Sequence, residues 1–565
     1  MRHAALAFSC ATTLVLLAGC ATTAPSPGSA GAGKAYAIDV PAVAHPQGET
    51  PAWWYRSGAA RAAANGAMNG KAKNVILFLG DGMSLTTVAA ARILDGQRKG
   101  QSGEENRLSW ENFPATALSR TYNTNSQTPD SAGTMTAITT GVKSHMGAIS
   151  VSAGKRDDCA ESLQHRLLTW LELADSAGLA TGVVTTTRLT HATPAATYAH
   201  SPDRNWENDA DLPNEAKEQG CKDIAQQLLD KRYGRGPTVA LGGGREEFTS
   251  YAERDPEYDD KVGLRLDGRN LVEEWRLAHP GGAYVWNKQQ FDAAQDAPAL
   301  LGLFEYDHMR YNHDRPKDPG GEPSLAEMTT AAIRTLSKNP DGYVLMVEGG
   351  RIDHASHAGN AFRALDETIE LSKAVQAAAD ATSADDTLII VTADHSHTLT
   401  FVGYPLRGNP ILGKVRGGSG EDSSSDFALD GLGLPYTTLN YMNGPGYTGA
   451  SNEAPAGPKK FDHSPSSFEA ADGRPNLRDV DTEDPDYMQE ALFPSKAETH
   501  GGDDVGIWAR GPGSEAVRGS VEQNVIYHFI VQATPKLRQR LCAAGDCNAD
   551  GVPVELPKPA DFEKK

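Results

Sequence analysis

The sequence predicts an α/β fold: a three-layer sandwich in which helices cover both faces of a largely parallel central sheet, with one loop-rich insertion. Apolar runs of strand length alternate with helix-length segments over most of the chain, a pattern typical of parallel sheets. Between residues 401 and 496, Gly, Pro, Ser and Asp dominate instead, which indicates an inserted subdomain. A chain of 565 residues can form one large domain with insertions or two smaller domains.

Short apolar runs mark the expected strands. They cover residues 74–79, 181–185, 238–241, 343–347, 387–392 and 505–509. Apolar spacing and helix-start signals mark the expected helices. These begin near residue 53 and cover about 85–94, 167–177, 360–379 and 523–533. We expect residues 51–400 and 497–545 to form the core and residues 546–565 to form a C-terminal tail.

The first twenty residues have the pattern of an export signal. Arg2 gives a positive start, residues 6–17 are mostly apolar, and residues 17–20 (Leu-Ala-Gly-Cys) end the segment. The apolar run is too short to span a membrane as a helix. The quartet resembles a bacterial lipoprotein cleavage box, which predicts a lipidated Cys20 that anchors the chain in the cell envelope, in the periplasm or at the outer membrane. The alternative is an ordinary signal peptide that contains a cysteine.

Export also predicts a linker and an oxidising environment. Residues 21–50 are rich in Ala, Thr, Pro, Ser and Gly without periodicity and are expected to form a flexible linker. Disulfides persist outside the cytoplasm. The cysteines beyond the linker can form two disulfides in three alternative pairings; they are Cys159, Cys221, Cys542 and Cys547.

The charge balance excludes one class of partner. The formal net charge is -20, and the sequence contains no basic stripe to offset it. Nucleic-acid binding depends on such a stripe. We therefore expect no nucleic-acid partner.

Acids and histidines follow the expected strands. Asp81, Glu348 and the pair Asp394-His395 lie at strand ends, the edge at which parallel α/β sheets bind ligands. Other segments add further donors, namely His191, Asp353, His357 and His500. Because such a cluster is costly to bury without cations, it predicts sites for two or three metal ions.

Asp353 and His357 are four residues apart, so a helical turn would place both side chains on one face. A carboxylate and an imidazole on one face suit a cation such as zinc, which binds N and O donors in a tight shell. Taken alone, the spacing also fits a surface ion pair. The acids at the other strand ends favour the metal site.

Asp130 and Ser131 precede a run of small residues, which indicates a capped helix start. A serine in this position faces free backbone N–H groups and the positive end of the helix. That setting stabilises an alkoxide and binds phosphate oxygens. A plain N-cap without further function is the alternative.

Over about residues 50–545, these motifs together resemble the alkaline phosphatase family. The matching segments occur in the same order along the chain: residues 80–83 (GDGM), 129–131 (PDS), 347–349 (VEG) with 352–353 (ID), 392–397 (TADHSH) and 498–500 (ETH). The resemblance implies hydrolysis of small phosphate monoesters through a phosphoserine intermediate, which releases inorganic phosphate and an alcohol.

The resemblance also implies a role for each matching residue. Ser131 corresponds to the nucleophile, Arg204 to the guanidinium that holds the phosphate, and Asp130 to the residue that orients Arg204. One zinc ion would bind Asp353, His357 and His500, and a second would bind Asp81, Asp394 and His395. A magnesium ion would bind Asp81, Thr193 and Glu348.

Two histidines depart from the best-known enterobacterial form, which has Asp and Lys where this chain has His191 and His354. Animal-type enzymes have histidine at both positions. We place His354 with the substrate-binding residues Ser131 and Arg204. We place His191 beside the third metal. The identity of this metal stays open, because imidazole suits zinc or cobalt better than magnesium.

Further segments resemble the animal-type enzymes, including residues 205–206, 255–258, 302–305 and 404–408. In that group a calcium ion binds residues that match Glu257, the Phe304 carbonyl, Glu305 and an acid that aligns with Glu322. Cys159 with Cys221 matches an animal-type disulfide, and Cys542 with Cys547 lies near the second. The insertion corresponds to the region that crowns the dimer in that group, so the resemblance implies a crown-like subdomain and a homodimer.

The implied mechanism agrees with the residue chemistry, because phosphoryl transfer requires positioning and charge neutralisation. Arg204 can hold two phosphate oxygens in a bidentate geometry that Lys cannot supply. Two alternatives stay open. One is a related hydrolase that cleaves phosphodiesters or sulfate esters, and the other is a metal-stabilised surface protein that has lost turnover.

Overall fold

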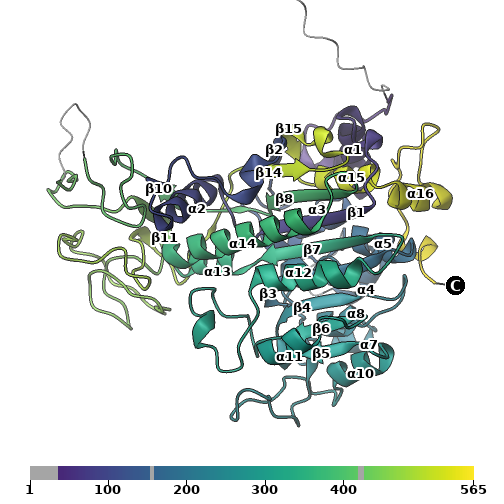
Figure 1. Ribbon diagram of the computed structural model, residues 1–565, viewed down its shortest axis with the longest axis horizontal. Coiled ribbons are helices and arrows are strands. Elements are labelled where there is room, and N and C mark those ends of the chain that lie inside the picture. Colours follow the sequence, from purple (N-terminus) through teal and green to yellow (C-terminus); the bar gives the residue numbers. More distant parts are fainter. Residues whose placement is uncertain (1–35, 153–157, 418–425, 565) are drawn as a thin grey trace, which may run out of the picture.

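A ten-stranded sheet forms the centre of the computed structural model, which describes residues 36–152, 158–417 and 426–564 (Figure 1). In spatial order its strands are β15 (Arg518–Glu522), β2 (Ala115–Arg120), β14 (Val505–Arg510), β8 (Thr387–Ala393), β1 (Asn74–Gly80), β7 (Tyr343–Gly349), β3 (Ala180–Arg188), β4 (Val239–Gly243), β6 (Leu300–Leu303) and β5 (Ala283–Val285). Only β14 runs antiparallel to its neighbours within this sheet. The prediction of a largely parallel sheet is confirmed.

The central strands are apolar throughout because both of their faces are covered. Successive side chains of a strand point to opposite faces. In β1, Val75, Leu77 and Leu79 pack into one hydrophobic core, whereas Ile76 and Phe78 pack into the other. Every residue of β1, β7 and β8 is buried. The sheet therefore separates two cores and forms the middle layer of a three-layer sandwich.

Each core is closed by its own set of helices. Those of the first core are α1 (Pro51–Ala64), α3 (Ser131–Thr140), α5 (Trp170–Ser176), α6 (Ala192–Ala195), α8 (Ile224–Leu228), α9 (Arg245–Phe248), α10 (Leu271–Ala278), α15 (Val525–Ala533) and α16 (Pro535–Ala544). Those of the second are α2 (Leu85–Arg98), α11 (Lys288–Ala293), α12 (Leu325–Leu336), α13 (Arg351–His357) and α14 (Ala361–Ala381). Figure 1 shows α12 and α14 lying across one face of the sheet.

Shorter elements complete the body. They are the helices α4 (Cys159–Gln164) and α7 (Asn214–Glu218) and the 3₁₀ turns η1 (Pro46–Gly48), η2 (Ala67–Asn69), η3 (Ser109–Asn112), η4 (Arg315–Lys317), η5 (Ser514–Ala516) and η6 (Pro559–Asp561).

The strands that the sequence analysis missed lie at the two margins of the sheet: β15 and β2 at one margin, β6 and β5 at the other. β2 alternates buried and exposed residues, and β15 is mostly exposed. Strands near an edge need no continuous apolar run, because one face meets solvent or a thin covering. The sequences of β2 and β15 therefore lack the signal that identified the central strands, whereas β6 is a short, fully buried apolar run that the sequence analysis overlooked.

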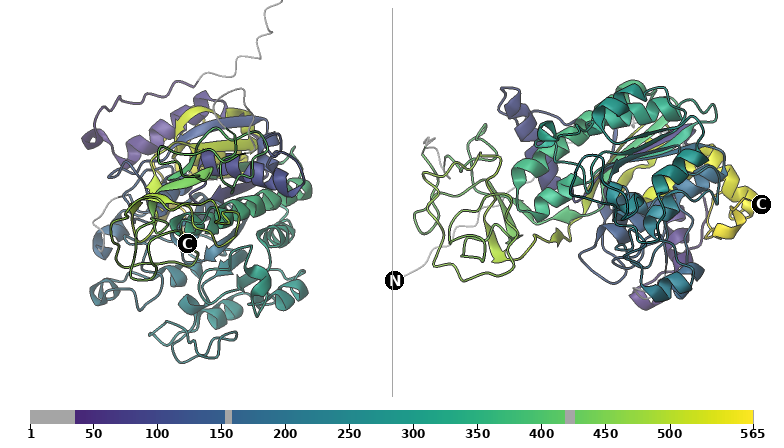
Figure 2. Two further views of the ribbon diagram at one scale, coloured as in Figure 1. Left: turned by 90° about the vertical axis from the view of Figure 1, so that its left-hand side faces the viewer. Right: turned by 90° about the horizontal axis from the view of Figure 1, so that it is seen from below.

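The inserted segment forms a separate lobe at one end of the body (Figure 2). Its regular structure is a small sheet of β10 (Leu399–Phe401), β11 (Leu439–Gly444) and β12 (Ala491–Pro494). The described residues between β10 and β12 contain no helix. A two-stranded ribbon of β9 (Ser396–His397) and β13 (His500–Gly501) joins the two sides of the insertion at the sheet edge.

The C-terminal residues pack against the body, and the cysteines form two disulfides. Residues 546–564 do not extend as a free tail, since Val552, Val554 and Phe562 are buried against the body. The disulfides pair Cys159 with Cys221 and Cys542 with Cys547, the pairing that the resemblance implied. The export signal and Cys20 lie outside the described residues. Among those described, no helix is both long and apolar enough to cross a membrane.

Candidate active site and metal centre

Three neighbouring parallel strands bring residues far apart in the sequence to one edge. Leu79 of β1 pairs with Glu348 of β7 on one side and with Thr392 of β8 on the other. Asp81 and Asp394 follow directly after β1 and β8. Because the carboxyl ends of parallel strands lie at one edge, the three carboxylates converge there. This arrangement was predicted from the strand ends.

Ser131 is the first residue of α3, and Asp130 caps that helix by accepting from the Gly133 N–H at 3.1 Å. The Ser131 side chain is buried, and its Oγ lies 3.1 Å from Nε2 of His395 and 3.4 Å from Oδ1 of Asp81. The helix thus directs its positive end and free N–H groups towards the serine. Ser131 sits where an alkoxide would be stabilised.

The first candidate metal group consists of Asp81, Asp394 and His395, all fully buried. His395 Nε2 lies 3.3 Å from Asp81 Oδ1 and 3.4 Å from Asp394 Oδ2. Burial, with the charge of Asp394, raises the pKa of Asp81 well above its usual value. Burial also lowers the pKa of His395 well below its usual value. Buried carboxylates beside a neutral imidazole have the electrostatics of a cation site.

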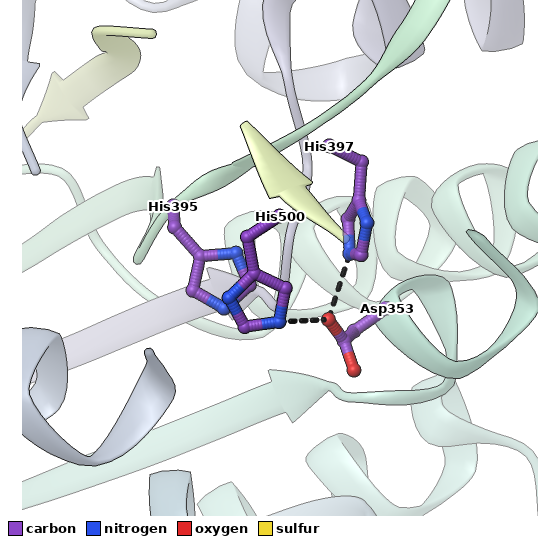
Figure 3. Close-up of side chains that lie close together, drawn as sticks. All are labelled: Asp353, His395, His397 and His500. Atoms are coloured by element: carbon purple, nitrogen blue, oxygen red, sulfur yellow. Dashed lines mark hydrogen bonds and ion pairs between the residues drawn. The ribbon is translucent and has the colours of Figure 1, made fainter. Parts of the chain in front are cut away.

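The second group consists of Asp353, His395, His397 and His500 (Figure 3). The helix α13 places Asp353 and His357 on one face, with 3.3 Å between Asp353 Oδ1 and His357 Nε2. His500 Nε2 lies 3.4 Å from the same oxygen. Burial opposes ionisation of Asp353, but the charge of His357 and hydrogen bonds from neighbouring histidines lower its pKa well below the usual value.

His397 is a site residue that sequence reasoning missed. Its Nε2 lies 2.7 Å from Asp353 Oδ1 and its Nδ1 lies 2.5 Å from Glu498 Oε2. Burial lowers the pKa of the ring, but Glu498 and Asp353 raise it overall to about 10. His397 is therefore a buried imidazolium between two carboxylates. The sequence signal was its position two residues after the predicted ligand His395, at the end of the short strand β9.

The third group consists of Asp81, His191 and Glu348. Thr193 Oγ1 donates to Asp81 Oδ2 at 3.4 Å, and Thr187 Oγ1 donates to Glu348 Oε2 at 3.3 Å. Burial raises the pKa of Glu348 to about 7. Its Oε1 is buried and has no hydrogen-bond partner among the described residues. A cation is the partner that this oxygen lacks.

Arg204 reaches the serine from a loop. Its Nη1 donates to Asp130 Oδ2 at 3.3 Å, and its Nη2 lies 3.0 Å from Nε2 of His191. Asp130 also accepts from the Gly147 N–H at 2.9 Å, so this carboxylate joins the helix cap to the guanidinium. The structure brings Ser131, Asp130 and Arg204 together as the resemblance implied.

His354 lies on the far side of His191, with 5.3 Å between their ring centroids. His308, which the sequence analysis did not single out, packs on both rings at 4.3 and 5.4 Å. It lies in the loop after β6, where no pattern marked it. Three imidazoles therefore line one side of the guanidinium site.

A separate acidic group lies away from this edge and consists of Glu257, Glu305 and Asp318. Both carboxylate oxygens of Asp318 are buried without a hydrogen-bond partner in the described part of the chain. Burial, with the charges of Glu257 and Glu305, raises the pKa of Asp318 to about 6. Glu322, the residue that the alignment favoured, instead accepts from the Arg310 N–H at 3.1 Å. Asp318, and not Glu322, thus groups with Glu257 and Glu305, although burial and the nearby charges of Asp318 and Glu305 also raise the pKa of Glu322 well above its usual value.

Fold and site together are typical of a hydrolase, because candidate cation sites lie near Ser131 and near a guanidinium that can hold an oxyanion. The family model of alkaline phosphatase matches residues 72–535. The chain is 45% identical over 471 residues to the tissue-nonspecific alkaline phosphatase isozyme of Gallus gallus, covering 82% of this chain and 84% of the relative. The Homo sapiens isozyme is 43% identical over 471 residues, covering 82% and 83%. The chain belongs to the alkaline phosphatase family.

Solved structures agree with this fold. The alkaline phosphatase of Thermus thermophilus has a TM-score of 0.57 at 24% identity and covers 84% of this chain and 96% of its own. A TAB5 alkaline phosphatase variant with Mg bound in the M3 site has a TM-score of 0.53 at 22% identity, covering 82% and 98%. Membership of the family makes this protein a phosphatase that acts on phosphate monoesters.

Proposed function

We propose that this protein hydrolyses phosphate monoesters in two steps, with Ser131 as the nucleophile. The observation that carries the proposal is the position of Ser131 Oγ, 3.1 Å from His395 Nε2 at the N-terminus of α3 and within reach of Asp81. In the first step the serine oxygen bonds to phosphorus as the ester P–O bond breaks, and the alcohol leaves with a proton. Water then hydrolyses the phosphoserine and releases inorganic phosphate.

Arg204 and the first turn of α3 bind the phosphate group of the substrate. The guanidinium is fixed by Asp130 and His191, so it meets the phosphate already oriented. Two of its N–H groups can hold two non-bridging oxygens, and the free N–H groups of the helix add further donors. Because this side of the site carries positive charge, it balances the charge that spreads over the phosphoryl oxygens in the transition state.

The donor sets fit divalent cations. Asp353, His357 and His500 would hold one zinc ion, Asp81, Asp394 and His395 a second, and Asp81, Thr193 and Glu348, beside His191, a magnesium ion. When bound, these ions supply positive charge that lowers the pKa of the serine hydroxyl and stabilises the leaving oxygen. The unpartnered Oε1 of Glu348 and the raised pKa of Asp81 support the fit. The Mg in the TAB5 variant supports magnesium in a related protein.

The peripheral acids support a calcium site. We propose Glu257, Glu305, Asp318 and the Phe304 carbonyl as its ligands, since oxygen-only sets of carboxylates and carbonyls suit calcium. The two unpartnered oxygens of Asp318 favour it over Glu322.

The decisive experiment compares hydrolysis of a chromogenic phosphate monoester with that of the matching diester from pH 7 to 10. We expect monoester turnover that Ser131→Ala abolishes, that a chelator abolishes and that added zinc restores. Diester turnover above monoester turnover would indicate a phosphodiesterase instead. Absence of turnover in the metal-loaded protein would contradict the proposal.

Export and anchoring through a lipidated Cys20 complete the proposed setting. The support is the cleavage pattern of residues 17–20 and the two disulfides, which suit an oxidising compartment. Expression in a bacterial host should give a mature chain that begins at Cys20 and partitions into detergent. Cys20→Ser should yield a soluble chain, and a soluble wild-type chain would contradict the anchor.

The inserted lobe supports a homodimer. Its small sheet exposes Phe401, Met442, Leu492 and Phe493, with Leu492 at 65% and Phe493 at 56% exposure. Grouped apolar side chains of this kind are uncommon on monomers and mark interfaces. Light scattering at micromolar concentration should give twice the chain mass, and Phe493→Asp should give the monomer mass. A monomeric wild-type protein would contradict this assembly.

A further inference from the structure

A cavity lies behind His354, and two of its lining residues, His308 and Arg351, contact the His354 ring. It has a volume of about 630 Å³ and lies between the loop after β6, the start of α13 and the inserted lobe. Its walls include His308, Tyr311, Arg351, Arg363 and Phe461. His308 packs on His354 with ring centroids 4.3 Å apart, and Arg351 Nη1 lies 2.7 Å from His354 Nδ1. We call this cavity the side pocket. It is wide enough for part of a leaving group.

Most charged groups of the side pocket have a charged partner, except that Asp462 has none among the described residues and Asp318 Oδ1 lies only 3.7 Å from Arg310 Nε. The pairs are Arg310 with Glu305 at 3.0 Å, Arg363 with Asp314 at 2.8 Å, Lys317 with Asp314 at 3.6 Å, and Asp307 with Arg188. Lys261 lies over the aromatic rings of Tyr258 and Tyr306. Such pairs leave little net attraction for a ligand.

Arg351 differs from the paired cations, and it differs from Lys261 in having a guanidinium held in place by His354 and Tyr311. Among the described residues no carboxylate lies within ion-pair distance of it, and its buried Nε has no hydrogen-bond partner. Its guanidinium stacks on Tyr311, with 3.9 Å from Cζ to the ring centroid, so its plane is held in place. A fixed guanidinium with unused N–H donors is a ready receptor for a planar or tetrahedral oxyanion.

We propose that Arg351 binds a second anionic group of the substrate, which makes the preferred class phosphate monoesters whose leaving group carries a further phosphate or carboxylate. This inference rests on the proposed function. The contacts run from Arg204 to His191 at 3.0 Å, from His191 to His354 at 5.3 Å between rings, and from His354 to Arg351 at 2.7 Å. The second anion must therefore lie several bonds from the scissile phosphorus.

Arg351 does not touch the reacting atoms in this arrangement. An interaction formed equally in the bound substrate and in the transition state lowers KM and leaves kcat unchanged. Arg351 is thus a specificity residue, and its effect should appear in the ratio between dianionic and simple substrates.

The test uses the metal-loaded full chain and linear alkanediol bisphosphates of two, four and six carbons, each compared with the alkyl monophosphate of equal length. Each bisphosphate has two equivalent phosphate esters, so its kcat/KM is halved before the comparison. The halved kcat/KM of the longer bisphosphates should exceed that of the alkyl monophosphates of equal length. Arg351→Gln should reduce this preference roughly tenfold, mainly through KM. Arg351→Lys should retain part of it, because the charge remains while the fork geometry is lost.

Lys317→Gln is the matched control, since it removes a positive charge from the rim of the same pocket. In this variant the ratio of kcat/KM for bisphosphate to kcat/KM for monophosphate should stay at the wild-type value. A preference that is absent at every length, or that Arg351→Gln leaves unchanged, would overturn the inference while the monoesterase activity stands. If the enzyme hydrolysed no phosphate monoester at all, the proposed function itself would be overturned.

Discussion

The two acidic groups of this molecule are built in different ways. At the sheet edge, Asp81 and Asp394 follow neighbouring strands, and their separation is set by the strand register. In the peripheral group, Glu257, Glu305 and Asp318 come from loops around α9, β6 and η4. The sheet fixes the first set rigidly, whereas loop lengths decide the second. Position in a sheet can be inferred from sequence, and position in a loop mostly cannot.

The built-in counter-charges differ as well. At the sheet edge a histidine, His397, neutralises Asp353. In the peripheral group arginines do so, because Arg245 lies 2.5 Å from Glu257 and Arg310 lies 3.0 Å from Glu305. A histidine can lose its proton in ordinary buffers, but an arginine cannot. The sheet edge should therefore respond to metals and pH in ways that the peripheral group does not.

The largest difference should appear in catalysis. Asp81→Asn keeps the shape of a side chain shared by two candidate metal groups but removes its charge. We expect kcat/KM for a phosphate monoester to fall by about 10³-fold, the effect of losing roughly 4 kcal/mol of transition-state stabilisation. Glu257→Gln, the peripheral counterpart, should change it less than about threefold. Steady-state kinetics of both variants measures the contrast, and equal losses would show that the two regions are not functionally distinct.

A smaller difference should appear in the pH dependence of stability after chelation. The folded-state pKa of His397 is raised to about 10, above the ordinary value of about 6.5. Its stabilising contribution is therefore fully present below pH 6.5 and is lost as the pH rises through 10. We expect the unfolding free energy of the metal-free protein to decline over this range and His397→Gln to flatten the decline. Denaturant titrations at pH 6, 8 and 10 check this, and an unchanged slope in the variant would contradict it.

The smallest expected effect is a rise in thermal stability when calcium binds the peripheral group. Ligand at about 100 times its dissociation constant stabilises a protein by about 2.7 kcal/mol, so calcium should raise the Tm of the wild type by a few degrees. Asp318→Asn should lose this rise, because it removes charge from a carboxylate with two unpartnered oxygens. Glu322→Gln is the control and should keep it. Calorimetry with and without calcium measures the rise in Tm of each variant. If Glu322→Gln lost the rise and Asp318→Asn kept it, Glu322 would be the ligand.

The same contrast explains how much the sequence could predict. The central strands were recognisable because burial on both faces makes every residue apolar, and the acids after them then had to meet. The edge strands β2 and β15 were missed because their exposed faces carry polar residues, a reason that does not apply to the fully buried β6. Ser131 was recognisable because an N-cap signal precedes a run of small residues.

The residues that the sequence did not identify lie where chain geometry is decided by tertiary packing. His308 reaches His354 from a loop whose path no periodicity records. Asp318 and Glu322 are four residues apart in one loop, and only the fold shows which carboxylate turns towards Glu257 and Glu305. His397 is different, since it lies two residues after the predicted ligand His395, and their ring centroids are 5.7 Å apart.

The bridge between Cys159 and Cys221 closes a segment of the chain that carries His191, Thr193 and Arg204. Trp206, two residues after Arg204, packs in the small apolar cluster around this bridge. Thermodynamic reciprocity then links redox state to anion affinity, because any ligand that orders the Arg204 loop must also disfavour opening of the bridge. Inorganic phosphate should shift the thiol–disulfide equilibrium towards the disulfide, and reduction should weaken phosphate binding by the same factor. The phosphate affinity of the Arg204 loop would thus depend on the oxidation state of its surroundings.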